Sequence, residues 1–498
     1  MGKRSSGAPT VGIDIGSSLI KVVEARPGKS GIQITALGIS PTPPGTIEND
    51  IVIDPQTLGQ AIRRLLSESG IKCKRCVSSV SGQSSVIVRI IEVPKMTRQE
   101  LAETMKWEIE RHVPFSASEV VMDFQPIERP EAPPDDQNME VLLAVAQQEV
   151  VNTHVEAIFA AGLEPVAIDV EPLAVCRSLV DLSRNGEAAG AVAIINMGAE
   201  TTEMAVFQDG ILAFPRTIPI AGDAITRALS DTLNIPLEEA ERIKRQRAKV
   251  MMDRIEIHAT GAEAGGFGIT GMGGTNATVD IGAPTAEEED LSTLGFIPGL
   301  GYGPSEPETQ QPAQQTGTVP DFDVDFGEPA APKPPSMAFD LSEEEPGSST
   351  PAGQNFDFSA DLQSGTGMAQ PTEPESSMPV PAGEQSLQVS EDAISDEMIF
   401  DAIAPVLVDL AAEIRRSLEY YVSRFQKQPE KILLCGGTAK LQDIDKFLEN
   451  ELAIPVIVAN PLRNVAFFPK GMSEDYLEEV SAVLPVSVGL AIRDLIGE

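Results

Sequence analysis

The sequence predicts an α/β protein made of two similar halves that face each other across a cleft. Apolar strands alternate with amphipathic helices from Thr10 onward, which is the pattern of an α/β chain. The stretch VGIDIGSSLIKVVEA, which begins at Val11, returns as VAIINMGAETTEMAV, which begins at Val192. This internal duplication indicates two equivalent units, and 498 residues exceed what one compact core holds.

The first half opens with three strands, TVGIDIG, LIKVVEAR and IQITALGISP, joined by two hairpin connections. A helix follows in DPQTLGQAIRRLLSESG. Asp54 is its expected N-cap, Pro55 takes the first helical position, and Gly70 is the stop signal.

Residues 84–163 form a self-contained pattern of strand, helix, two strands and helix inside this larger framework. Thr97 is the expected cap of the first of these helices, and Glu100, three residues on, is its capping-box partner. We therefore expect a small inserted subdomain here.

The second half begins with GAVAIINMGAETTEMAVFQDGILAFPRTIPI, in which Asp209-Gly210 signals a hairpin turn between two strands. Helical patterns cover residues 223–246 and 396–425. The run KILLCGGTAKLQDIDKFLENEL then predicts a strand, a Gly-Gly turn and a helix. PVIVANP adds one more strand, and VSVGLAIRDLIGE predicts a docked final helix.

Residues 250–395 differ in kind, because they are rich in Pro, Gly, Ser, Gln and acids and lack hydrophobic periodicity. Within them, residues 251–392 hold 25 acidic residues against two basic ones, Arg254 and Lys333. Such a segment buries too little apolar area to offset chain entropy, so we expect disorder. Its three Phe-Asp segments, DFDVDFGEP, MAFDLSEEEP and NFDFSADL, are either compositional chance or linear docking motifs for a basic partner.

The predicted organisation therefore runs in chain order as lobe I, first part (1–83), inserted small subdomain (84–163), lobe I, return (164–189), lobe II, first part (190–249), disordered acidic insert (250–395) and lobe II, second part (396–498).

Charge and composition exclude some partners. The formal net charge of −38 argues against a face that binds a phosphate backbone, and 4% aromatic residues argue against a base-stacking surface. We expect no nucleic-acid partner. Cys73 and Cys76 have the spacing of a zinc or redox site, but no second such pair follows, and their flanks predict a strand. We interpret these cysteines as structural.

No apolar run reaches the ~18 residues that span a bilayer. The stretch MGKRSSGAPT has basic residues without the apolar core of a signal peptide. We therefore expect a cytoplasmic protein that reaches a membrane only through a partner.

Three turns carry residues suited to a phosphorylated ligand. Gly16, Ser17 and Ser18 offer backbone N–H groups and hydroxyls, and Lys21 supplies a positive charge. Asp14 is a carboxylate placed to hold Mg²⁺ through water. The second turn spans residues 198–202 and the third residues 435–438, where two glycines let backbone approach a flat ring or a ribose.

In this order the turns resemble the phosphate-1, phosphate-2 and adenosine motifs of the actin-like ATPase superfamily, whose two ribonuclease-H-like lobes hold ATP between them. Further motifs narrow the resemblance to the PilM family of type IV pilus assembly proteins, relatives of the cell-division protein FtsA. These motifs are GIDIGSSLIKVVEA, the inserted EVPKMTRQELAETMKWEIERHVPFSASEVVMDFQPI, NMGAETTEMAVFQDGILAFPRTIPIAGDAIT, EEAERIK and EIRRSLEYY. The resemblance covers residues 10–247 and 396–496.

The resemblance implies an actin-like fold and a set of ATP-binding residues. It implies a metal-side carboxylate for Mg²⁺ at Asp14. It implies nucleotide contacts at Gly16, Ser17, Ser18, Lys21, Gly198, Ala199, Thr201, Thr202, Gly222, Glu241, Lys244, Gly436, Gly437 and Thr438. Glu241 and Lys244, spaced to share one helical face, would flank ribose and adenine.

One position departs from the family pattern, because Asn196 replaces the usual aspartate of the second turn. An amide cannot accept a proton or bind Mg²⁺ as a carboxylate does. We therefore expect nucleotide binding with at most slow hydrolysis. No replacement base is recognisable in the sequence, although Glu200 lies close by.

The leading hypothesis is an ATP-binding scaffold at the cytoplasmic face of the inner membrane. It would bind the cytoplasmic tail of PilN and couple nucleotide state to partners such as the pilus assembly motor ATPases. The alternatives are an active ATPase or kinase of the same fold, and an FtsA-like cell-division or type II secretion scaffold.

Overall fold

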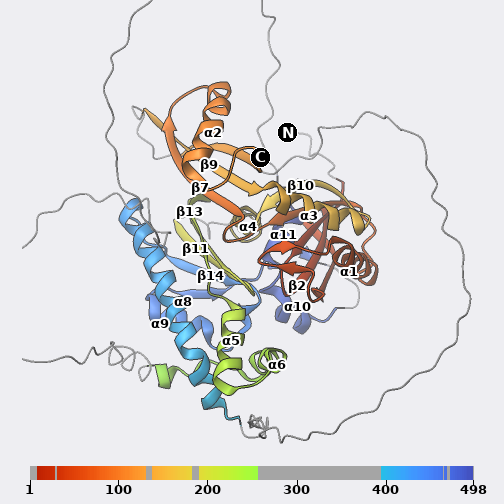
Figure 1. Ribbon diagram of the computed structural model, residues 1–498, viewed down its shortest axis with the longest axis vertical. Coiled ribbons are helices and arrows are strands. Elements are labelled where there is room, and N and C mark those ends of the chain that lie inside the picture. Colours follow the sequence, from red (N-terminus) through yellow and green to blue (C-terminus); the bar gives the residue numbers. More distant parts are fainter. Residues whose placement is uncertain are drawn as a thin grey trace, which may run out of the picture. The chain divides into compact units, whose positions relative to one another are not determined.

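The computed structural model describes residues 8–28, 31–129, 137–181, 190–255, 394–463, 465–467 and 472–496, all of them within one compact unit. A sheet with the strand order β10-β6-β1-β2-β3-β16 defines lobe I (Figure 1). Its strands are β1 (Thr10–Ile15), β2 (Leu19–Gly28), β3 (Gly31–Pro41), β6 (Arg75–Val80), β10 (Glu164–Val170) and β16 (Ala466–Phe467).

The sheet of lobe II repeats this arrangement with the order β13-β12-β11-β14-β15. Its strands are β11 (Ala191–Met197), β12 (Thr202–Gln208), β13 (Ile211–Ile218), β14 (Lys431–Cys435) and β15 (Val456–Val458). In both sheets an antiparallel three-strand meander is extended by parallel strands beside its first strand. The duplication predicted from the sequence is therefore present in the topology.

Local sequence signals explain where several elements begin and turn. Asp209 and Gly210 have φ values of 52° and 83°, the backbone of a tight hairpin turn between β12 and β13. Asp54 caps α1 (Pro55–Glu68) by accepting from the Thr57 N–H. Thr97 and Glu100 form the predicted capping box of α2 (Arg98–His112).

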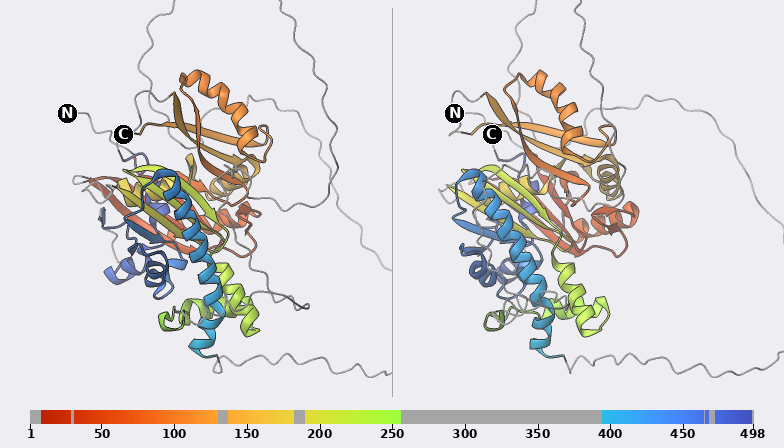
Figure 2. Two further views of the ribbon diagram at one scale, coloured as in Figure 1. Left: turned by 90° about the vertical axis from the view of Figure 1, so that its left-hand side faces the viewer. Right: turned by 60° about the vertical axis from the view of Figure 1, so that its left-hand side comes forward.

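The inserted subdomain is a sheet of order β7-β9-β8 with α2 on one face. Its strands are β7 (Val86–Pro94), β8 (Val120–Ile127) and β9 (Asn138–Gln147). Leu101 and Met105 of α2 pack against Val141 and Leu143 of β9 in a separate apolar cluster. Figure 2 shows this subdomain standing away from the two large sheets.

The helix α3 (Gln148–Ala160), predicted as part of that subdomain, packs instead with lobe I. Its residues Val150, Ala157 and Ile158 belong to the same buried cluster as Val11 and Ile13 of β1. The packing of its side chains therefore places the end of the inserted subdomain near Gln147, before α3.

Helices of lobe II cover one face of its sheet: α5 (Gly222–Leu233), α6 (Leu237–Arg247), α8 (Asp396–Phe425) and α9 (Ile444–Leu452). The helical stretch predicted for residues 223–246 is two helices, because Asn234 turns left-handed at φ 52° and Pro236 precedes α6. Figures 1 and 2 show α8 running alongside α5, with which it packs.

The end of the chain returns to lobe I, although residues 396–498 were predicted as lobe II. β16 pairs with β3. α10 (Glu474–Ser481) joins a buried apolar cluster with residues of β2 and β3, and α11 (Pro485–Ala491) packs on β1 and β2. Gly12 makes this possible, since a Cβ there would lie 2.0 Å from the Ser487 carbonyl oxygen. The predicted docked helix is α11, and its residues are all buried.

The predicted disordered insert, with its Phe-Asp segments, lies for the most part outside the described residues. Its two flanks are described and adjoin each other, because Arg247 donates to the Ile394 carbonyl at 2.6 Å and pairs with Asp396. Within the described part of the chain, no helix is long and apolar enough to cross a membrane.

Candidate functional site

A cavity of about 750 Å³ lies where the turns of the two lobes meet. Every predicted binding residue except Thr202 lines it: Asp14, Gly16, Ser17, Ser18, Lys21, Gly198, Ala199, Thr201, Gly222, Glu241, Lys244, Gly436, Gly437 and Thr438. Thr202 is buried in β12, where its hydroxyl donates to the Ile220 carbonyl at 2.7 Å.

The two duplicated turns have the same backbone geometry. The Gly16 N–H donates to the Leu19 carbonyl at 3.1 Å, and the Gly198 N–H donates to the Thr201 carbonyl at 2.9 Å. The Gly198 carbonyl accepts from the Thr438 hydroxyl at 2.7 Å, which joins the second turn to the third. The fold thus places all three turns along the wall of the same cavity.

The side chains behind the two turns differ. Asp14 lies opposite Lys21 in the β1–β2 ladder, and the two form an ion pair of 2.8 Å. At the equivalent positions, Asn196 lies opposite Glu203. Burial, together with the nearby charge of Glu171, raises the pKa of Glu203 to about 8. The charge pattern of the first turn is therefore not repeated in the second.

Two glycines permit close packing around the cavity, and a third leaves it open. A Cβ on Gly222 would lie 2.7 Å from the Thr438 hydroxyl oxygen, and Gly436, at φ 96°, lies against the Met197 carbonyl. A Cβ on Gly437 would meet nothing within 4 Å. The cavity wall at Gly437 is therefore open. This is compatible with the prediction that the backbone there lies against the flat face of a nucleotide base.

Glu171, the first residue of α4 (Glu171–Cys176), is a cavity residue that the sequence analysis missed. Asn196 donates to its Oε2 atom at 3.2 Å. Burial and, to a lesser extent, the charge of Asp14 raise the pKa of Glu171 to about 7, although the charge of Lys21 opposes the rise. A carboxyl group with this pKa is suited to act as a general base near neutral pH. The signal available in the sequence is Pro172, which marks a helix start directly after a strand.

Asp50 and Glu200 bring two more carboxyl groups to the cavity from opposite lobes. Asp50 occupies the left-handed turn (φ 62°) between β4 (Ile47–Glu48) and β5 (Ile51–Val52). The two carboxyl groups interact directly, and the charge of Asp50 adds to the rise in the pKa of Glu200. Burial raises the pKa of both groups, that of Glu200 to about 6.

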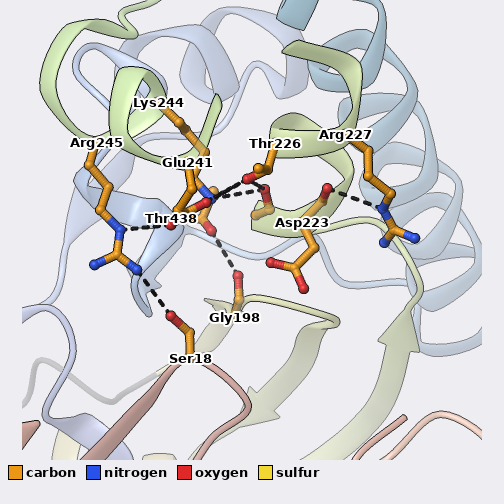
Figure 3. A network of polar contacts seen from close by, with 10 residues as sticks. Ser18, Gly198, Asp223, Thr226, Arg227, Glu241, Lys244, Arg245 and Thr438 are labelled. Carbon is orange, nitrogen blue, oxygen red and sulfur yellow. Dashed lines mark hydrogen bonds and ion pairs between the residues drawn. The ribbon is translucent and has the colours of Figure 1, made fainter. Parts of the chain in front are cut away.

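Glu241 and Lys244 lie together on one face of α6, with a contact of 2.6 Å between Oε2 and Nζ. Lys244 also donates to the Gly222 carbonyl at 3.0 Å and to the Thr226 hydroxyl at 2.8 Å. Figure 3 shows this network above the Gly198 turn. The pair is thereby fixed at the side of the cavity formed by lobe II.

The donor set is compatible with Mg²⁺ held mostly by other ligands. Among the described residues, no group of three or more His, Cys, Asp or Glu side chains is placed to hold a metal ion alone. Mg²⁺ commonly keeps several waters and uses one or two carboxylates plus substrate phosphates. Asp14 offers such a carboxylate, and a divalent cation beside it would offset its repulsion with Glu171.

Comparison with known proteins bears on the family and on the fold. The family model described as type IV pilus assembly protein PilM matches residues 12–251 and 384–495. A solved structure described as a PilM-PilN type IV pilus biogenesis complex has a TM-score of 0.62 and 24% identity, and the match covers 99% of each chain. With the repeated sheet order, this likeness confirms the predicted actin-like fold.

Curated relatives include the cell division protein FtsA of Bacillus subtilis (strain 168), 24% identical over 258 residues, which are 47% of this chain and 57% of FtsA. FtsA of Pseudomonas aeruginosa is 26% identical over 268 residues, 49% of this chain and 62% of that protein. The chain thus spans little more than half the length of these relatives.

Proposed function

The chain belongs to the PilM family of type IV pilus assembly proteins, and from that membership we propose that it is an ATP-binding scaffold of the pilus assembly platform. The observation that carries the nucleotide part is the convergence of three glycine turns, from both duplicated halves, on one cavity of about 750 Å³. Backbone N–H groups, hydroxyls and paired cations line the same space, as recognition of a phosphate chain requires.

ATP would lie between the lobes with its phosphates at the Gly16 and Gly198 turns and its base against Gly437. Mg²⁺ would be held by the phosphates, by waters and by Asp14. Because these contacts come from both lobes, bound nucleotide would favour the closed arrangement, and this differential affinity would couple nucleotide state to partner binding.

The proposed partner is the cytoplasmic tail of a PilN-like membrane protein, which would hold the chain at the cytoplasmic face of the inner membrane. The solved structure named as a PilM-PilN complex supports this proposal. The proposal also includes contact with the pilus assembly motor ATPases. An FtsA-like cell-division or type II secretion role has less support, because the PilM model matches the chain more extensively than FtsA does.

The nucleotide part is tested by a graded series at Gly437, where added atoms enter open space. We expect Gly437→Ala to weaken binding of a fluorescent ATP analogue modestly and Gly437→Leu to abolish it, with the melting temperature retained in both. Equal affinity of wild type and Gly437→Leu would refute the site. The partner part is tested separately by titrating a peptide of a PilN-like tail with and without Mg-ATP.

A second candidate function is slow ATP hydrolysis, and Glu171 is the observation that favours it. Its raised pKa and its hydrogen bond from Asn196 give the cavity an oriented base, although the usual carboxylate of the second turn is absent. Single-turnover measurement with wild type and Glu171→Gln tests this candidate. Hydrolysis that Glu171→Gln leaves unchanged would exclude Glu171 as the base.

A further inference from the structure

Arg245 of α6 reaches across the mouth of the cavity from lobe II to lobe I. Its Nη2 atom donates to the hydroxyl oxygen of Ser18, in the β1–β2 turn, at 3.2 Å. Figure 3 shows the guanidinium group between the helix and that turn. The Arg245 side chain is 54% exposed, so this contact lies at the rim, whereas the Asn196–Glu171 contact lies deeper between the lobes.

The guanidinium group is held in place by its second contact. Its Nε atom donates to Glu241 Oε1 at 2.7 Å, one helical turn away. Burial would raise the pKa of Glu241, but hydrogen bonds from Lys244 and Thr226 outweigh it and lower that pKa. Glu241 therefore stays ionised, and it orients Arg245 toward Ser18.

The contact to Ser18 is the outermost link of a continuous polar chain. Glu241 Oε2 accepts from the Thr226 hydroxyl at 2.6 Å, and Lys244 ties both residues to the Gly222 carbonyl. Gly222 in turn donates to the Gly198 carbonyl at 3.2 Å. The chain therefore connects the first turn, through the nucleoside side of the cavity, to the second turn.

We propose that Arg245 is a positioning residue that holds the rim of the cleft closed and thereby sets how long a nucleotide stays bound. The inference rests on the proposed nucleotide site, and it concerns the rate of release. A ligand enclosed between the turns leaves only when the lobes separate, and the Arg245–Ser18 bond must break first. This role requires the planar guanidinium group of arginine. The ammonium group of a lysine at position 245 would have no rigid second donor for Glu241.

The test is the dissociation rate of a fluorescent ATP analogue, chased with excess ATP in a stopped-flow instrument. We expect Arg245→Ala to release it roughly three- to ten-fold faster, the range for loss of one partly exposed hydrogen bond. Arg245→Lys keeps the charge and should give most of the same acceleration. Arg227→Ala is the matched control, because Arg227 is an exposed arginine on α5 that donates to the carbonyl of Asp223 on its own helix.

A double-mutant cycle separates the rim contact from a general effect on folding. Ser18→Ala removes the acceptor, so adding Arg245→Ala to it should accelerate release no further. Independent, multiplying effects would overturn the inference, as would an Arg245→Lys variant that behaves as wild type, because charge alone would then suffice. Absence of binding by wild type would refute the proposed nucleotide site itself, and tight binding with unchanged release from Arg245→Ala would refute only the role of Arg245.

Discussion

Replacement of Glu171 by glutamine probes the electrostatics at the centre of the cavity. The pKa of Glu171 rises from 4.5 to about 7 in the folded protein. At about 1.4 kcal/mol per pKa unit, ionising this carboxyl group in the folded state costs about 3 kcal/mol. A glutamine of the same shape carries no charge and still accepts the hydrogen bond from Asn196.

The sign of the pH dependence follows from the direction of the shift. Below pH 4.5 the carboxyl group is neutral in both folded and unfolded chains, so it imposes no penalty. As pH rises from 4.5 to 7 the unfolded chain loses the proton first, and the folded state is progressively destabilised. Glu171→Gln should therefore raise the free energy of unfolding by about 3 kcal/mol at pH 8 and change it little at pH 4.5.

Urea denaturation followed by circular dichroism at both pH values measures this difference. Glu68→Gln, at the exposed end of α1, is the control and should stay within about 0.5 kcal/mol at both. An equal effect of Glu171→Gln at pH 4.5 and pH 8 would refute the reasoning. If the chain hydrolyses ATP, the same variant should bind nucleotide and lose about 10²–10⁴-fold in single-turnover rate.

Three further outcomes are expected. Asn196→Asp places a second carboxylate beside Glu171, so it should lower stability above pH 7 by about 1–3 kcal/mol, measured by the same urea titration, without raising turnover. His154 accepts or donates a hydrogen bond of 2.8 Å with Ser78 in the core, and burial lowers its pKa to about 4. Its stabilising contribution is therefore complete above pH 6.5 and lost as pH falls toward 4. His154→Gln should remove about 3 kcal/mol of the fall in unfolding free energy between pH 6.5 and pH 4, measured by urea denaturation. Replacing residues 258–391 with a Gly-Ser linker of about ten residues should keep nucleotide binding and the melting temperature, because the flanks are already joined through Arg247 and Ile394; a large fall in melting temperature would mean that the insert is structural.

The parts of the fold that the sequence predicts well are those set by short-range physics. Capping by Asp54, the Thr97–Glu100 box and the Asp209-Gly210 turn depend on residues within a few positions of each other, and each forms as expected. The repeated strand–turn–strand unit is also visible in the sequence, because both copies keep a glycine at the start of the turn.

Long-range packing accounts for what the sequence does not reveal. Nothing local in α11 indicates that it lies on β1, because the contact depends on Gly12, more than 400 residues earlier in the chain. The same holds for Glu171, whose raised pKa comes from burial and from Asp14, a distant residue that only the folded chain brings near. Site residues on turns follow from motifs, whereas a residue that acts through its environment requires the tertiary structure.

The return of the chain end to lobe I has a mechanical consequence. The order of the described elements places two connections between the lobes, one between α4 and β11 and one between β15 and β16. When two chain segments connect two lobes, the least hindered relative motion is rotation about the line through both connections. The same connections resist sliding and full separation of the lobes. α11 packs closely against α4, because a Cβ on Gly489 would lie 1.8 Å from the Ala174 carbonyl oxygen. Such a rotation would have to break the polar contacts that join the lobes away from these connections, and the Arg245–Ser18 bond is one of them.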